Sequence, residues 1–166
     1  MTYTEVAERY CGDVISGVIP AGNLVKLACA RHIWDRARES DPDYPYRYDE
    51  KKAERRCSFS EKLPHVKGKW AGQKLKLSPH QVFIRCAVWG WVRKKDDKRR
   101  FNVAYVEIPR KNGKSVDAAD SGLYMLALDR EKGAEVYSGA TSEKQALEVF
   151  RPAWQMANAL PNLREK

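Results

Sequence analysis

An apolar run, a short basic loop and a helix-forming run follow one another over residues 101–128, and this order constrains the fold more than any other part of the chain. The loop ends in Gly113-Lys114-Ser115. A Gly-Lys-Ser sequence that follows a strand and opens a helix is the arrangement that binds phosphate groups. The usual pattern has a glycine five residues before the Gly-Lys pair, and here that position is Ile108. The alternative is an ordinary turn with an exposed lysine.

The elements around this loop predict an α/β fold. Residues 101–108 are apolar on both alternating sets apart from two positions, which is typical of a strand in a parallel sheet with both faces covered. A helix over 116–128, a second strand over 134–138 and a long helix after Ser142 follow. This order is the opening of a three-layer P-loop NTPase with a mainly parallel sheet, which we expect to be incomplete here.

Helical patterns dominate the preceding residues. They cover residues 4–17, a second stretch that ends near Ser40, and a charged stretch over 49–63. We therefore predict an N-terminal helical appendage over residues 1–70 and the N-terminal part of a P-loop ATPase domain over residues 71–166. Pro152 lies inside the last predicted helix, where we expect it to kink or split the helix.

The loop residues suit the chemistry of a nucleoside triphosphate. Gly113 lets the backbone approach an anion, Lys114 places a positive charge on the β- and γ-phosphates, and the Ser115 hydroxyl can ligate Mg²⁺. Arg110 or Lys111 could reach the γ-phosphate, and the planar guanidinium favours Arg110, which together with Lys114 forms the predicted catalytic pair. The predicted ATP-binding residues are Gln81, Arg110, Lys111, Asn112, Gly113, Lys114 and Ser115.

Gln81 is the predicted adenine contact, because a Gln amide can pair with both N6 and N7 of adenine. The alternative is a capping or surface role, since Ser78 suits a helix N-cap and Pro79 the first helical position. Trp89 and Trp91 are expected in the core.

The chain has 31 Lys and Arg against 22 Asp and Glu, a net charge of +9, which favours an anionic partner such as nucleic acid. A basic run over 93–100 could contact a DNA backbone, or it could be a solvated hairpin. The four cysteines form no C-x-x-C pair, which argues against zinc and for a reduced, cytosolic setting. Neither a membrane span nor a signal peptide is evident. The candidate DNA-binding residues are Arg93, Lys94, Lys95, Lys98, Arg99 and Arg100.

Several motifs in register resemble the large terminase subunit of tailed bacteriophages, in the branch whose phosphate loop reads Pro-Arg-Lys-Asn-Gly-Lys-Ser. The likeness covers nearly the whole chain, including a leader over 14–22 and 27–32. The motif at Gln81 resembles the family's adenine motif, in which a Trp often stands where His80 is. The matching segments are 77–81, 90–91, 99–101, 105–115, 123–124, 133–141 and 145–146.

The resemblance implies an ATP-driven motor that packages double-stranded viral DNA into a procapsid, with ATP and Mg²⁺ as cofactors. It places the family's loop arginine at Arg110 and its lysine at Lys114. It also implies a portal protein and a small terminase subunit as partners, a ring-shaped homo-oligomer for the full-length protein, and the cytoplasm of the infected host. Family members continue through further ATPase strands into a nuclease domain, so we expect this chain to be the N-terminal part of such a protein.

The sequence is compatible with two functions. The first is the ATP-binding portion of a packaging motor, which would hydrolyse ATP only with acidic residues from a further strand. The second is a truncated, inactive terminase that serves as a binding module for DNA, portal or small subunit. A helicase fragment is a weaker third reading, because the leader segment argues against it.

Overall fold

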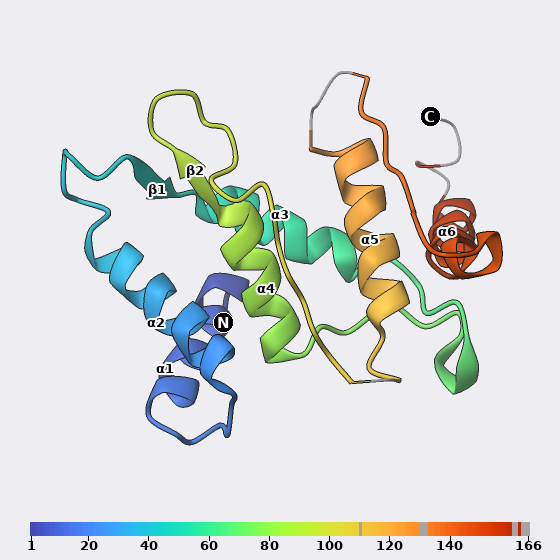
Figure 1. The fold of residues 1–166 in the computed structure, drawn as a ribbon, viewed down its shortest axis with the longest axis horizontal. Helices are drawn as coiled ribbons and strands as arrows, with labels where there is room; N and C mark the ends of the chain where they lie inside the picture. The colour runs from blue at the N-terminus through green and yellow to red at the C-terminus, as the bar shows by residue number, and fades with distance from the viewer. Residues whose placement is uncertain (110, 130–132, 161–162, 164–166) are drawn as a thin grey trace. The chain divides into compact units, whose positions relative to one another are not determined.

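The computed structural model describes residues 1–109, 111–129, 133–160 and 163 (Figure 1). The chain forms two compact units, each built from two separate stretches of sequence. Unit 1 comprises Met1–Ser58 and Leu77–Tyr105, and unit 2 comprises Phe59–Lys76 and Val106–Lys166. These bounds differ from the predicted boundary at residue 70, and the division of the complete fold into domains stays a prediction.

Unit 1 is mainly helical. Its helices are α1 (Tyr3–Ile15), α2 (Asn23–Ala37), most of α3 (Glu50–Ser60) and α4 (Pro79–Gly90). A capping box starts α1, because Glu5 N–H donates to Thr2 Oγ1 at 3.1 Å while Thr2 N–H donates to the Glu5 carboxylate at 2.7 Å. Helix α1 packs against both α2 and α4. The predicted helices of this part of the chain are thus confirmed, with small differences at their ends.

A short antiparallel ladder in unit 1 was not predicted. Strand β1 (Tyr46–Tyr48) pairs with β2 (Trp91–Arg93), and Tyr48 lies opposite Trp91. Trp89 and Trp91 are buried, as expected. A side chain on Gly90 would meet the Tyr48 ring, because an added Cβ would lie 2.4 Å from Tyr48 Cε2. Only glycine therefore lets the end of α4 approach the Tyr48 ring this closely.

The interior of unit 1 holds the four cysteines and a buried histidine. Cys11, Cys29, Cys57 and Cys86 are all buried and free. His32 is 2% exposed, and its Nδ1 accepts a hydrogen bond of 3.1 Å from Trp91 Nε1. Burial, above all, lowers the pKa of His32 to about 4. The imidazole is therefore neutral at physiological pH, as its role as an acceptor requires.

Unit 2 contains α5 (Lys114–Ala127), α6 (Glu143–Ala159) and a lysine hairpin, the name used here for residues 61–76. Helices α5 and α6 pack together. Asp120 of α5 is buried and accepts a hydrogen bond of 2.8 Å from Ser60 Oγ, and Tyr124 packs edge-on against Phe59 with ring centroids 5.5 Å apart. These two contacts hold α5 to the end of α3.

The lysine hairpin folds back on itself through backbone hydrogen bonds. Leu75 N–H donates to Leu63 at 2.8 Å, and His65 N–H donates to Gln73 at 2.7 Å. The tip is a short 3₁₀ turn, η1 (Gly68–Trp70). Leu63 and Leu75 are buried, so they anchor the hairpin.

The two predicted strands at 101–108 and 134–138 are not formed. Both segments are non-helical, and within the described ranges the one named sheet is the antiparallel pair of β1 and β2, so a mainly parallel sheet is not confirmed. A strand requires a neighbouring backbone for its N–H and C=O groups. Apolar side chains here lie open to solvent instead, with Val103 86% and Tyr137 84% exposed.

The last predicted helix is confirmed, and of the two predicted effects of Pro152 the split is wrong, while the kink stays a prediction. Helix α6 continues from Glu143 to Ala159 with Pro152 buried inside it. Ser142 caps it, since Gln145 N–H donates to Ser142 Oγ at 3.4 Å. No helix among the described residues is long and apolar enough to cross a membrane.

Candidate phosphate-binding site

The loop before α5 has an unusual backbone. Gly113, the N-cap of α5, has φ 78° and ψ 14°, and Lys111 has φ 68°. Both residues thus lie in the left-handed region, which costs a non-glycine residue roughly 1–2 kcal/mol. Strain of this kind persists where the surrounding structure requires it, often at a ligand site. Turns with left-handed residues also gather successive N–H groups into a concavity that suits an anion.

Lys114 is the first residue of α5, and its side chain folds back over the loop. Its Nζ donates to the carbonyl oxygen of Ile108 at 2.9 Å, while Asn112 Nδ2 donates to the carbonyl oxygen of Pro109 at 3.3 Å. The loop is therefore closed by its own side chains. The ammonium group lies exposed at the helix N-terminus, where the first N–H groups have no partner within the helix.

Three predicted loop residues remain, and the structure describes two of them. Lys111 is exposed and Ser115 is half-buried in the first turn of α5. Arg110, the predicted γ-phosphate contact, lies outside the described residues. The left-handed backbone and the row of N–H and ammonium donors fit a triphosphate. Among the described residues, no cluster of three or more His, Cys, Asp and Glu could hold a metal ion. The Ser115 hydroxyl is the predicted group of this loop that could ligate Mg²⁺.

The segment that follows α5 returns beside it. Val136 lies against Gly122 of α5, since a Cβ added at Gly122 would be 3.2 Å from Val136 Cγ1. Ser138 Oγ then donates to the carbonyl oxygen of Ala146 in α6 at 2.9 Å. Residues 133–139 therefore run between α5 and α6 in unit 2, although they form no ladder (Figure 1).

Gln81 is engaged at the start of α4. Its Oε1 accepts a hydrogen bond of 3.0 Å from Ser78 N–H, and the Ser78 hydroxyl lies 3.0 Å from the same atom. The capping role left open by the sequence is therefore present in the structure. Gln81 belongs to unit 1 and the phosphate loop to unit 2. The adenine contact stays a prediction.

The predicted DNA-binding run 93–100 begins at the last residue of β2 and turns back to a bridge between Arg99 and Val92. Several of its cations have partners within unit 1. Arg93 pairs with Asp96 at 2.8 Å, and Lys94 Nζ donates to the carbonyl oxygen of Asp41 at 2.8 Å. Arg100 pairs with the buried Asp35 at 2.6 Å. Lys95 and Lys98 are exposed. The solvated-hairpin alternative describes this geometry well, while DNA contact stays a prediction.

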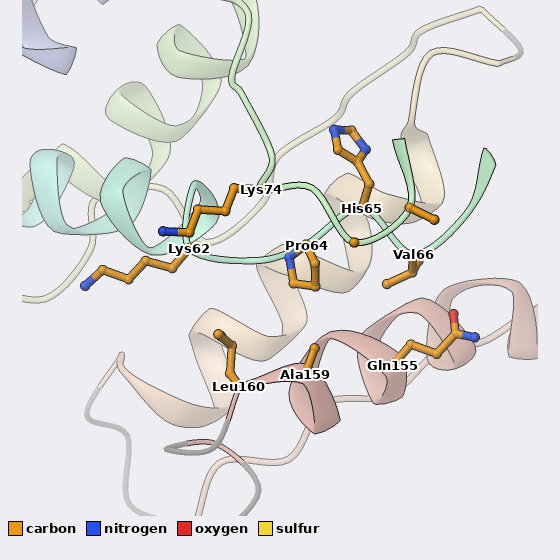
Figure 2. Close-up of a pocket in the computed structure, with 10 residues that line it drawn as sticks. Lys62, Pro64, His65, Val66, Lys74, Gln155, Ala159 and Leu160 are labelled. Atoms are coloured by element: carbon orange, nitrogen blue, oxygen red, sulfur yellow. The ribbon is translucent and has the colours of Figure 1, made fainter. Parts of the chain in front are cut away.

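A hollow of about 490 Å³ lies between the lysine hairpin and the C-terminal part of α6, and shares no lining residue with the phosphate loop. Figure 2 shows Pro64 and Val66 on the side of the hairpin turned toward α6, where Ala159 and Leu160 complete an apolar wall. Lys62 and Lys74 extend to the side opposite Gln155 (Figure 2). None of the predicted site residues lines this hollow.

Comparison with known proteins gives two consistent matches. Residues 79–165 match the family described as terminase large subunit, ATPase domain. A curated relative, the terminase large subunit of Enterobacteria phage HK97, is 33% identical over 116 residues, which is 69% of this chain and 22% of that relative. No solved structure matches significantly.

The family match extends over more than half of the chain, from the first residue of α4 beyond the end of α6. It therefore includes the candidate phosphate loop, residues 108–115, and both helices of unit 2, which places the chain in the class of terminase ATPase domains. The chain belongs to the terminase large-subunit family, as the sequence motifs indicated. It spans about a fifth of the length of the curated relative.

Proposed function

We propose that residues 108–115 and the first turn of α5 bind the triphosphate of ATP, as the nucleotide site of a motor that moves viral DNA into a procapsid. The observation that carries this proposal is the backbone of the loop before Lys114, the first residue of α5. Lys111 and Gly113 of this loop both lie in the left-handed region. Membership of the terminase large-subunit family supports the same function.

In this proposal, the backbone N–H groups of the loop and the α5 N-terminus hold the phosphate oxygens. The Lys114 ammonium leaves the Ile108 carbonyl oxygen for the β- and γ-phosphates, and this exchange opens the loop. Arg110 is proposed to contact the γ-phosphate. Mg²⁺, when bound with ATP through the Ser115 hydroxyl, neutralises phosphate charge. The same proposal includes duplex DNA as the substrate and the portal and the small terminase subunit as partners. It also includes a ring-shaped oligomer and the cytoplasm of the infected host as the location.

The experiment is a titration of the chain with a fluorescent ATP analogue and Mg²⁺. We expect saturable binding that Lys114→Ala weakens by about 10- to 100-fold, because a charge-assisted contact is lost. Lys144→Ala is the matched control, since Lys144 is also an exposed lysine in the first turn of a helix, but follows no left-handed loop. Equal affinities for the two variants would refute the site.

Nucleotide preference tests the proposed adenine contact without disturbing the cap. Gln81→Glu keeps an oxygen that can accept from Ser78 N–H, but it removes the amide donor that adenine N7 requires. We expect this variant to lose a preference for ATP over GTP while its thermal stability is unchanged. We further expect no steady-state phosphate release by the chain alone, and release that Lys114→Ala abolishes would overturn that expectation.

A further inference from the structure

The lysine hairpin carries a dense positive charge, most of which has no ion-pair partner in the described part of the chain. It holds five lysines and one glutamate in 16 residues. Lys67 pairs with Glu148 of α6 at 3.6 Å, and both side chains are mostly exposed. No described residue forms an ion pair with the other four, which are Lys62, Lys69, Lys74 and Lys76.

The two arms of the hairpin separate this charge from the apolar core of unit 2. Leu63 and Leu75 are buried, whereas their neighbours Lys62, Lys74 and Lys76 are exposed. In the second arm this alternation follows from the non-helical backbone after the bridge at Lys74, in which successive side chains point to opposite faces. In the first arm, Lys62 and Leu63 lie in the turn that ends α3. Figure 2 shows that the amino groups of Lys62 and Lys74 extend to one side. The arms therefore present a row of ammonium groups rather than scattered charges.

An aromatic side chain completes the tip of the hairpin. Trp70 is 51% exposed, and the ammonium group of Lys69 lies 4.9 Å from the centroid of its ring. Gly68 and Gly72 flank it with φ values of 76° and 85°, and these left-handed positions turn the chain so that the indole stands outside the hairpin. An exposed indole beside ammonium groups can stack on a base whose phosphates the lysines contact.

We propose that the lysine hairpin is a binding site for an unpaired nucleic-acid strand. Lys62, Lys74 and Lys76 contact successive phosphates, and Trp70 stacks on one base. Recognition is independent of sequence, because ammonium groups meet phosphates as point charges and an indole stacks on any base. The hairpin prefers a single strand to a duplex, since paired bases offer no free face to Trp70.

The test measures binding of the whole chain to a fluorescein-labelled oligothymidylate of about 20 nucleotides, long enough for a single contact surface. The triple variant Lys62→Ala, Lys74→Ala, Lys76→Ala is expected to lower the slope of log affinity against log salt by about 2. Near 0.1 M salt this corresponds to a loss of affinity on the order of a hundredfold.

The control removes the same charge elsewhere. Lys26, Lys51 and Lys144 are exposed helix residues outside the hairpin, and changing all three to Ala gives an identical net charge. This variant should keep most of the affinity and of the salt slope. Equal losses in the two triple variants would mean that only net charge matters, and the proposal would fail.

The stacking contact has its own matched pair of variants. Trp34 is 56% exposed in α2 and has the Arg38 guanidinium 4.4 Å from its ring centroid, so it resembles Trp70 in exposure and in its cationic neighbour. We expect Trp70→Ala to weaken binding of the single strand about tenfold, and Trp34→Ala to leave it unchanged. Binding of a duplex of equal length should be weaker and insensitive to Trp70→Ala.

Besides equal losses in the two triple variants, three further binding results would overturn the proposal. These are no salt-dependent binding of the oligothymidylate, equal effects of Trp70→Ala and Trp34→Ala, or a duplex bound as tightly as the single strand. An oligouridylate should bind like the oligothymidylate, because the hairpin contacts only phosphates and a base face. The measurement contains no ATP, and Lys114→Ala should not change it. If Lys114→Ala acts as strongly as the triple variant, the phosphate loop holds the strand and the hairpin proposal fails, whatever the result with ATP.

Discussion

Acidification should destabilise the folded chain through His32, and His32→Asn should remove this effect. The His32 ring is enclosed by aromatic side chains, with edge-on contacts to Tyr48, Phe83 and Trp91 at centroid distances of 5.6, 5.8 and 5.9 Å. Trp91 Nε1 donates to its Nδ1. A proton on Nδ1 would therefore replace an acceptor with a second donor, inside an apolar site that solvates a charge poorly.

The direction and size of the effect follow from the two pKa values. Burial lowers the folded-state pKa of His32 from 6.5 to about 4. Below pH 6.5 the unfolded chain binds a proton that the folded chain does not, so the free energy of unfolding falls as the pH falls through this window. The complete loss is about 3 kcal/mol once the pH is below the folded-state value, and about 2 kcal/mol is lost between about pH 7.5 and pH 5.

The assay is urea unfolding followed by tryptophan fluorescence at about pH 7.5 and pH 5, a range in which most carboxyl groups remain ionised. In His32→Asn the side-chain oxygen can take over the position of Nδ1 as acceptor for Trp91, and nothing titrates. This variant should lose about 2 kcal/mol less than the unmodified chain on acidification. His65→Asn, at a less buried position in the lysine hairpin, is the control and should behave like the unmodified chain. If acidification lowered the free energy of unfolding equally in the unmodified chain and in His32→Asn, the reasoning would be refuted.

Two further predictions concern unit 1. Gly90→Ala should destabilise the fold by about 1–3 kcal/mol because its Cβ would overlap the Tyr48 ring, whereas Gly12→Ala, in open space on α1, should stabilise it by about 0.5–1 kcal/mol. Thermal unfolding should show shifts of the melting temperature in opposite directions, and equal shifts would contradict this prediction. Arg100→Met should lower the free energy of unfolding by about 3–5 kcal/mol, since it leaves the Asp35 carboxylate buried without its cation. Adding Asp35→Asn should recover part of that loss in urea unfolding, and an Arg100→Met variant of unchanged stability would contradict the prediction.

Local patterns predicted the helices well because the information that forms a helix is contained within it. Hydrogen bonds within α5 and α6 join residues four apart, and caps such as Ser142 act over one turn. The predicted strands at 101–108 and 134–138 failed for the opposite reason. Their composition favours an extended backbone, but a ladder needs a partner strand that no local pattern specifies. The pair of β1 and β2 was missed because each strand has only three residues.

The candidate phosphate site shows the same division between local and distant information. The left-handed Gly113 at the N-terminus of α5 was readable from Gly-Lys-Ser before a helical pattern. The left-handed Lys111 was not, because a lysine gives no signal for that backbone. Gln81 carried two possible roles in the sequence, and the structure contains the local one. Capping needs only Ser78 three residues away, whereas an adenine contact depends on how distant parts of the chain come together.

Charge density along the sequence is a poor guide to which cations can meet a ligand. The run 93–100 has the highest density of basic residues, yet Arg100 is held by a carboxylate 65 positions earlier in the chain, a pairing that no local pattern reveals. The lysine hairpin differs from this run, because Lys74 and Lys76 flank the buried Leu75 and are both exposed. The buried leucine fixes that arm to unit 2, so the lysines on either side of it must face solvent. Periodicity around a buried residue, more than the number of charges, therefore identifies the cations that remain available for a nucleic-acid strand.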